Sequence, residues 1–182
     1  MIAVVDTETT YSDDVMSLGV VIARKDDLSR VGSLYYVFPE ECRKSAMYSD
    51  VLYMKGQDVI RKSRKDSLME LRQCFKERGV QAIFAYNAKF DRTHLPELSD
   101  YVWRDIMRLA AYRQHNPFIP DHVPCCKTGR MKSGFGVEAI MRMISGDKRY
   151  NEVHNALCDA DDELKIMQLL GHAADLYPEV RG

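Results

Sequence analysis

Runs of apolar residues separated by polar turns predict a chain that mixes strands and helices. Three short runs follow one another at residues 2–5, 15–23 and 33–38, and each has the length and the β-branched and aromatic content of a strand. The polar stretch 11–14 between the first two is typical of a turn. Strands this close in sequence favour an antiparallel meander, which Pro39 ends.

The spacing of apolar positions becomes helical after a polar, weakly periodic stretch at residues 40–65. Residues 66–78 carry Leu68, Leu71 and Phe75 on one face, and Gly79 follows as a stop signal. Further along the chain we expect strands at 80–85 and 101–103 and helices at 90–98, 105–112, 136–143 and 160–176. Alternating strands and helices imply parallel crossovers. The expected fold is therefore an α/β mixed sheet, a three-strand antiparallel meander plus parallel strands, with helices on both faces.

Length and composition suit one domain over residues 1–182, with a Pro- and Gly-rich loop insertion at about residues 113–134. No apolar run is long enough to span a bilayer, and the first residues do not resemble a secretory signal, so we expect a cytoplasmic protein. Five cysteines, an odd number, favour reduced thiols. The adjacent Cys125 and Cys126 lack the two-residue gap of zinc sites, which disfavours a structural zinc.

The net charge of −1 argues against a protein that coats nucleic acid through bulk electrostatics. Two basic segments are candidates for contacts with a nucleic-acid backbone: residues 61–65, and Lys127, Arg130 and Lys132 in the long loop. Such segments are more often solvated surface, and that alternative stays open for both. The loop segment is the better candidate because it contains glycines and precedes the last long helix, near whose start Asp159 lies.

Carboxylates occur in three separate motifs that carry most of the chemical information. Asp6 and Glu8 close the first apolar run, Asp91 follows the run at 80–85, and Asp159 lies near the start of the last helical stretch. If the fold gathers these groups, they repel one another unless cations lie between them. Oxygen ligands favour Mg²⁺ or Mn²⁺. The motifs therefore predict two divalent ions and metal-assisted phosphoryl chemistry.

Taken together and in this order, the motifs resemble those of the DEDD exonucleases, specifically the histidine branch called DEDDh, on a ribonuclease H-like fold. The matching motifs are Asp-x-Glu at Asp6, Asn-x-x-Phe-Asp ending at Asp91, and His-x-x-x-x-Asp from His154 to Asp159. Tyr86 stands where many relatives have His. The resemblance implies a metal-dependent 3′–5′ exonuclease that acts on a single-stranded 3′ end of DNA or RNA and releases nucleoside 5′-monophosphates.

The motif positions suggest a role for each residue. Asp6 and Glu8 are two apart, so a strand places both side chains on one face. With Asp159, they are expected to hold one ion, and Asp91 is expected to help place the second. His154 is the candidate general base, which takes a proton from the attacking water near neutral pH. The alternative for His154 is an ordinary partly buried or surface histidine.

Four further residues are candidate substrate contacts, each with an ordinary structural alternative. Thr7 and Thr9 could instead pack in the strand or begin a turn, and Asn87 could bond within its own turn. Phe90 could stack on a terminal base or belong to the core. Residues 161–163, all acidic, are expected on the solvent face of the last helix.

A second class of function is a nucleic-acid-binding or polymerase-associated module that keeps the fold with weak or no catalysis. Such modules usually lose a metal ligand, and none of the four carboxylates is missing here. The expected partner in either case is the 3′ end of single-stranded nucleic acid, and no membrane. No motif reads the sugar 2′-hydroxyl, so both DNA and RNA remain candidates, and no motif specifies an oligomeric state.

Overall fold

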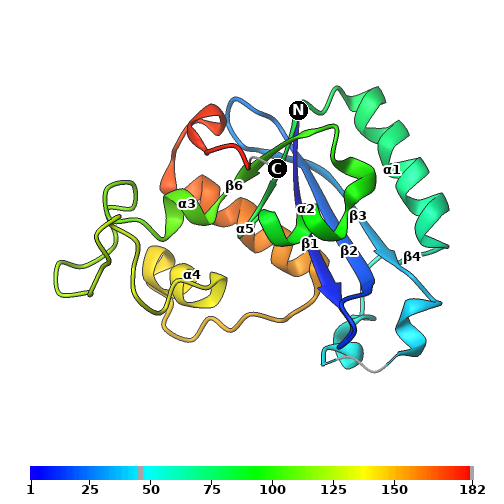
Figure 1. The fold of residues 1–182 in the computed structure, drawn as a ribbon, viewed down its shortest axis with the longest axis horizontal. Helices are drawn as coiled ribbons and strands as arrows, with labels where there is room; N and C mark the ends of the chain where they lie inside the picture. Colours follow the sequence, from blue (N-terminus) through cyan, green and yellow to red (C-terminus); the bar gives the residue numbers. More distant parts are fainter. Residues whose placement is uncertain (45–46, 181–182) are drawn as a thin grey trace.

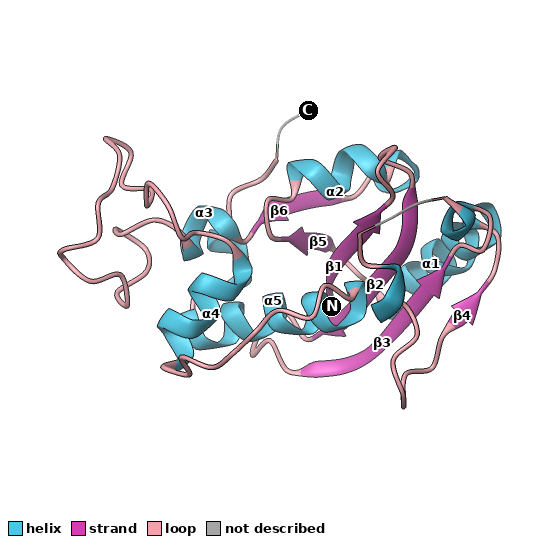
Figure 2. Cartoon of the chain, turned by 90° about the horizontal axis from the view of Figure 1, so that it is seen from below, coloured by secondary structure: helices cyan, strands magenta, loops and turns pink. Residues whose placement is uncertain are grey.

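A computed structural model describes residues 1–44 and 47–180 of the chain. Its centre is a six-stranded sheet in the order β4-β3-β2-β1-β5-β6, with helices on both sides (Figures 1 and 2). The strands are β1 (Ile2–Thr9), β2 (Val15–Ala23), β3 (Arg30–Val37), β4 (Ile60–Arg61), β5 (Ala82–Ala85) and β6 (Val102–Asp105). The first three form the predicted antiparallel meander, and β5 and β6 run parallel to β1. The expected ribonuclease H-like α/β fold is confirmed.

The first strand is longer than its apolar run predicts, because it continues through the polar residues to Thr9. Asp6 pairs with Gly19 and Glu8 with Ser17, so both acidic residues lie inside the strand rather than after it. The register shifts between Glu8 and Thr9, where the ladder ends. The neighbouring strand β2 is buried along its whole length and supplies the partners that hold this polar segment extended.

The described helices divide between the two faces of the sheet. The helices α1 (Arg64–Arg78) and α2 (Lys89–His94) cover one face, where they pack on Ala3, Val5 and Ile83. The opposite face carries α3 (Met107–Ala110), α4 (Val137–Ser145) and α5 (Ala156–Leu170), packed on Val4 and Phe84. Because successive strand residues point to opposite faces, β1 contributes to both cores.

Helix α5 differs from its predicted range of 160–176. It begins at Ala156, because Asn155 caps it by accepting a hydrogen bond from the Cys158 backbone N–H at 3.3 Å. It ends at Leu170, because Gly171 adopts a left-handed conformation with φ 68°. A short 3-10 helix, Ala174–Leu176, follows as a separate turn.

The start of α5 lies directly against β2. A Cβ atom at Gly19 would lie only 2.0 Å from the carbonyl oxygen of Ala156, so only glycine permits this approach. Gly19 is also the pairing partner of Asp6. This close contact therefore brings the first turn of α5, with Asp159, next to the acidic end of β1.

Two other segments complete the described chain. Strand β4 was not predicted, because two residues give no periodicity; it pairs with Tyr36 and Val37 at the sheet edge. Residues 113–134 contain no helix or strand and project from the body beside α3 and α4 (Figure 1). Arg113 holds this loop together by donating to the carbonyl oxygens of Pro120 and Val123.

Of the helices described, none is both long and apolar enough to cross a membrane. All five cysteines are free thiols.

Candidate active site

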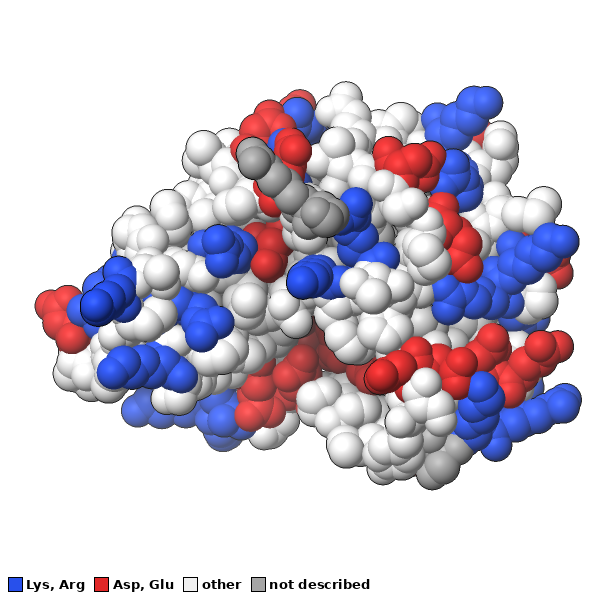
Figure 3. Space-filling model, viewed as in Figure 1, with Lys and Arg blue, Asp and Glu red and all other residues white. Residues whose placement is uncertain are grey.

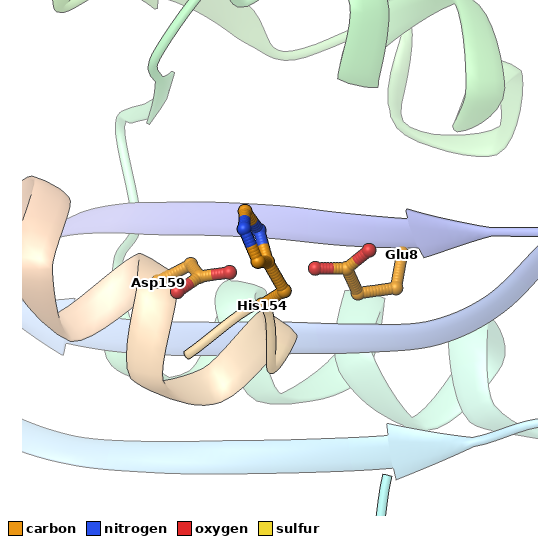
Figure 4. A group of neighbouring side chains, drawn as sticks. All are labelled: Glu8, His154 and Asp159. Atoms are coloured by element: carbon orange, nitrogen blue, oxygen red, sulfur yellow. The ribbon is translucent and has the colours of Figure 1, made fainter. Parts of the chain in front are cut away.

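Glu8, His154 and Asp159 meet where β1 ends and α5 begins. One potential ligand atom from each of the three lies within 4.8 Å of the others. The carboxylates of Glu8 and Asp159 point toward each other, and the imidazole of His154 lies beside the gap that separates them (Figure 4). Across residues 1–44 and 47–180, no other group of three His, Cys, Asp or Glu side chains comes together in this way, and Cys125 and Cys126 take part in none.

Asp6 and Asp91 adjoin this cluster. Asp91 lies on α2, is 2% exposed, and accepts a hydrogen bond of 2.8 Å from the Thr7 hydroxyl to its Oδ1. Asp6 lies two residues before Glu8, and its pKa is raised well above the usual range by burial and then by the charges of Asp91, Asp159 and Glu8. The four predicted carboxylates therefore share one region, although they come from three distant parts of the chain.

The electrostatics of this region suit divalent cations. Burial raises the pKa of Glu8 and of Asp159, and the charge of Glu152 raises both further. The Oδ1 atom of Asp159 is buried and has no hydrogen-bond partner among the described atoms. No ion pair within the described residues involves any of the four carboxylates. Hard cations prefer such oxygen atoms and would remove the repulsion, so the residues fit Mg²⁺ or Mn²⁺.

These raised pKa values predict that the metal-free protein loses stability as the pH rises. A carboxyl group whose pKa is raised by folding binds more protons in the folded than in the unfolded state. Its contribution to the free energy of unfolding is therefore complete below its unfolded pKa of about 4, and it is lost as the pH rises through neutrality. We expect urea unfolding with a chelator to give a lower free energy at about pH 8 than at about pH 5, by about 1–3 kcal/mol.

Asp159→Asn is the matched comparison for that pH effect. It removes one of the repelling charges and keeps the side chain's size, so its free energy of unfolding should fall less over the same pH range. Adding Mn²⁺ at the higher pH should restore stability to the wild type, because an ion that binds only the folded state stabilises it. A wild-type stability that rises with pH would contradict the raised pKa values.

His154 lies in the loop before α5 with φ 57°, a left-handed conformation that His adopts more readily than most residues. Its ring stacks on Tyr48, with the ring centroids 4.1 Å apart and the planes 18° from parallel. The next residue, Asn155, is fully buried and donates to the carbonyl oxygen of Val51 at 2.8 Å. Gln57 donates to its Oδ1 at 2.9 Å. The segment that carries Tyr48 is thus tied to the start of α5.

Three residues at the site were not identified from the sequence: Tyr48, Glu152 and Glu163. Glu152 raises the pKa of Asp159 more than any other charged neighbour does. Glu163 is 1% exposed, so its expected place on the solvent face was wrong. Its position four residues after Asp159 is a helical spacing that could have indicated a shared face. Tyr48 left no signal in the sequence, because tertiary packing alone brings it to His154.

The candidate substrate contacts lie in different surroundings. Thr7 is buried and its hydroxyl is committed to Asp91. Phe90 is 40% exposed, which rules out the core alternative, and its ring lies 4.2 Å from that of His94. Asn87 is exposed with φ 61°, and its backbone N–H donates to Asp105 at 3.2 Å. Thr9 is partly exposed at the end of β1.

Charged side chains are unevenly distributed around the site. Acidic side chains line a hollow in the lower centre of the face in Figure 3, and Lys and Arg side chains gather to its left, where residues 113–134 project. In that loop, Arg130 lies 4.9 Å from the ring of Phe135, while Lys127 and Lys132 are exposed. In the other basic segment, residues 61–65, Lys62 and Arg64 form ion pairs with Glu70 and Glu97. Fewer of its basic side chains are therefore available to a nucleic-acid backbone.

Comparisons with known proteins agree with the class of fold that this sheet defines. The sequence matches no family model and no curated protein. Solved structures that share the fold include a full-length 3′-exonuclease, with a TM-score of 0.64 and 14% identity over 99% of this chain and 90% of that one. A second is a 3′-exonuclease in a structure of 3′-end-specific recognition of a histone mRNA stem-loop, with a TM-score of 0.63 and 13% identity over 99% of this chain and 70% of that one.

Proposed function

We propose that this protein is a metal-dependent 3′–5′ exonuclease of the DEDDh type, and that the whole chain acts as one catalytic domain. One observation carries the proposal. Glu8 comes from the start of the chain and His154 and Asp159 from near its end, yet one potential ligand atom of each lies within 4.8 Å of the others. Asp6 and Asp91 lie beside them. The shared fold with two 3′-exonucleases supports this reading.

The carboxylates of Asp6, Glu8 and Asp159 would hold one ion, and Asp91 would help to hold a second. When bound, such ions stabilise the negative charge that develops on a phosphodiester and make water more acidic. Thr7 fixes the Asp91 carboxylate through its hydroxyl. A carboxylate orientated in this way needs no rearrangement when a cation binds.

His154 would take the proton from the attacking water. One imidazole nitrogen lies within 4.8 Å of a carboxylate oxygen of Glu8 and of Asp159, so the ring is close to the water that an ion held there would bind. Tyr48 covers one face of the ring and limits its rotation. The base is therefore held in place, although it lies in a loop.

The substrate end would enter beside Phe90 and Asn87, which are exposed and available to a terminal nucleotide. Lys127 and Lys132 in the projecting loop are the candidate contacts for the backbone further along the strand. Because the solved neighbours include one bound to an RNA stem-loop, RNA is a substrate to test beside DNA.

The test of this function is degradation of 5′-labelled single-stranded DNA and RNA oligonucleotides with Mn²⁺ or Mg²⁺. We expect stepwise shortening from the 3′ end with release of nucleoside 5′-monophosphates, and complete arrest by a chelator. An unpaired 3′ tail should be degraded faster than a blunt duplex, because a narrow two-metal site between β1 and α5 would have to admit a free end. Binding of the oligonucleotides without shortening, in the presence of metal, would favour a binding or polymerase-associated module instead.

A further inference from the structure

Glu163 lies on the buried face of α5, one turn after Asp159. It is 1% exposed and is flanked along the helix by the buried residues Ala160 and Leu164. Its acidic neighbour Asp161 lies at the surface instead, where it pairs with Arg30. A helix turns about 100° per residue, so residues 159 and 163 share a face while 161 points away.

One carboxylate oxygen of Glu163 has no partner. The backbone N–H of Tyr86, which directly follows β5, donates a hydrogen bond to the Glu163 carboxylate. Its Oε2 atom is buried and unpaired within the described residues, as is the Oδ1 atom of Asp159 on the turn before. An unpaired carboxylate oxygen in a protein interior is unfavourable, and native structures rarely keep one without a compensating group.

The surroundings of this oxygen are acidic. The charges of Asp6, Asp91 and Asp159 all act on Glu163, and together with burial they raise its pKa well above the usual range. Helix α5 packs on β1, the strand that carries Asp6. None of the ion pairs between described residues includes Glu163. A cation bound in this region would compensate this oxygen.

We propose that Glu163 is a fifth carboxylate of the divalent-metal site, a positioning residue whose unpaired Oε2 atom strengthens the binding of the ions that Asp6, Asp91 and Asp159 hold. This inference rests on the proposed metal-dependent function and adds a residue that the three motifs do not contain. A buried charge beside a metal site attracts the ion strongly because little water screens it. Groups that support metal ligands in this way typically change metal affinity about 10- to 100-fold.

The experiment is titration of the metal-free protein with Mn²⁺ alone, followed by calorimetry, for the wild type and Glu163→Gln. Gln keeps the size of the side chain and an acceptor for the Tyr86 backbone, so it removes only the charge. We expect Mn²⁺ affinity to fall about 10- to 100-fold. Thermal unfolding of metal-free Glu163→Gln should occur at a temperature no lower than that of the wild type, since one repelling carboxylate is gone.

Two further variants separate charge from packing. Asp161→Asn makes the same charge change on the outer face of α5 and should leave Mn²⁺ affinity near the wild-type value. Glu163→Asp keeps the charge but shortens the side chain, so it should bind Mn²⁺ more tightly than Glu163→Gln. If packing were the only role of Glu163, the shorter Asp would be the more damaging change.

The outcomes separate this proposal from the proposed function. Wild-type affinity in Glu163→Gln, in a protein that binds Mn²⁺ and is weakened by Asp6→Asn, would overturn the role of Glu163 and leave the exonuclease proposal standing. Failure of the wild type to bind Mn²⁺ at all would overturn both.

Discussion

Asp6→Asn is expected to lower the rate of phosphodiester hydrolysis by at least about 10³-fold, because it removes one of the carboxylates proposed to hold the ions. Burial, and then the charges of Asp91, Asp159 and Glu8, raise the pKa of Asp6, so its carboxylate lies close to the other three. Asn is nearly isosteric with Asp and removes the negative charge that a hard cation requires. The measurement is the single-turnover rate of 3′-nucleotide release at saturating Mn²⁺.

Asp13→Asn is the matched control for this change. Asp13 lies in the turn after the same strand, is exposed, and has φ 61°, a conformation that Asn tolerates as well as Asp does. The control should degrade oligonucleotides at the wild-type rate. Activity that survives in Asp6→Asn, with the protein folded and contaminating nuclease excluded by the same preparation, would refute the proposed chemistry.

His154→Asn is expected to lower kcat by about 10²- to 10⁴-fold while leaving KM close to its wild-type value. The physical reason is that, in the proposed mechanism, the imidazole accepts a proton in the reaction step and contributes little to holding the strand. Asn suits this position because it accepts the left-handed φ of 57° that His154 adopts, whereas Ala would add backbone strain. The measurement is steady-state degradation of a labelled oligonucleotide over a range of its concentration.

A Mn²⁺ titration of the same variant distinguishes a base from a ligand. The His154 ring lies within 4.8 Å of the ligand atoms of Glu8 and Asp159, so it is close enough to bind an ion itself. If His154 is the base, its replacement should change Mn²⁺ affinity far less than Asp6→Asn does. An equal loss of affinity in both variants would assign His154 to the metal instead.

Two neighbouring substitutions serve as controls for the histidine. His122→Gln removes an exposed imidazole in the projecting loop and should leave kcat unchanged. Tyr48→Phe removes only the hydroxyl group and keeps the ring that stacks on His154, so its kcat should stay close to the wild-type value. A large loss in Tyr48→Phe would mean that the hydroxyl, and not the stack, acts at the site.

Local patterning was enough to locate most of the sheet. The meander strands were predicted near their observed ranges because each is an apolar run closed by a turn, and β2 at residues 15–23 matches fully. Helix α1 was predicted to within two residues because Gly79 gives it a clear stop. Among the failures, the missed strand β4 depends on pairing at an edge, the extension of β1 to Thr9 on its pairing with β2, and the start of α5 on a cap from Asn155. Periodicity registers none of these.

The sequence by itself determined most of the strands and helices and which carboxylates and histidine the motifs contain, because strand and helix periods and short spacings are local properties. Only the tertiary structure decided that Tyr48 lies on His154, that Glu163 turns inward, and that Phe90 stays exposed. These outcomes depend on which surfaces meet. The approach of α5 to β2 at Gly19 sets the first two, since it fixes both the loop before the helix and the face that the helix buries.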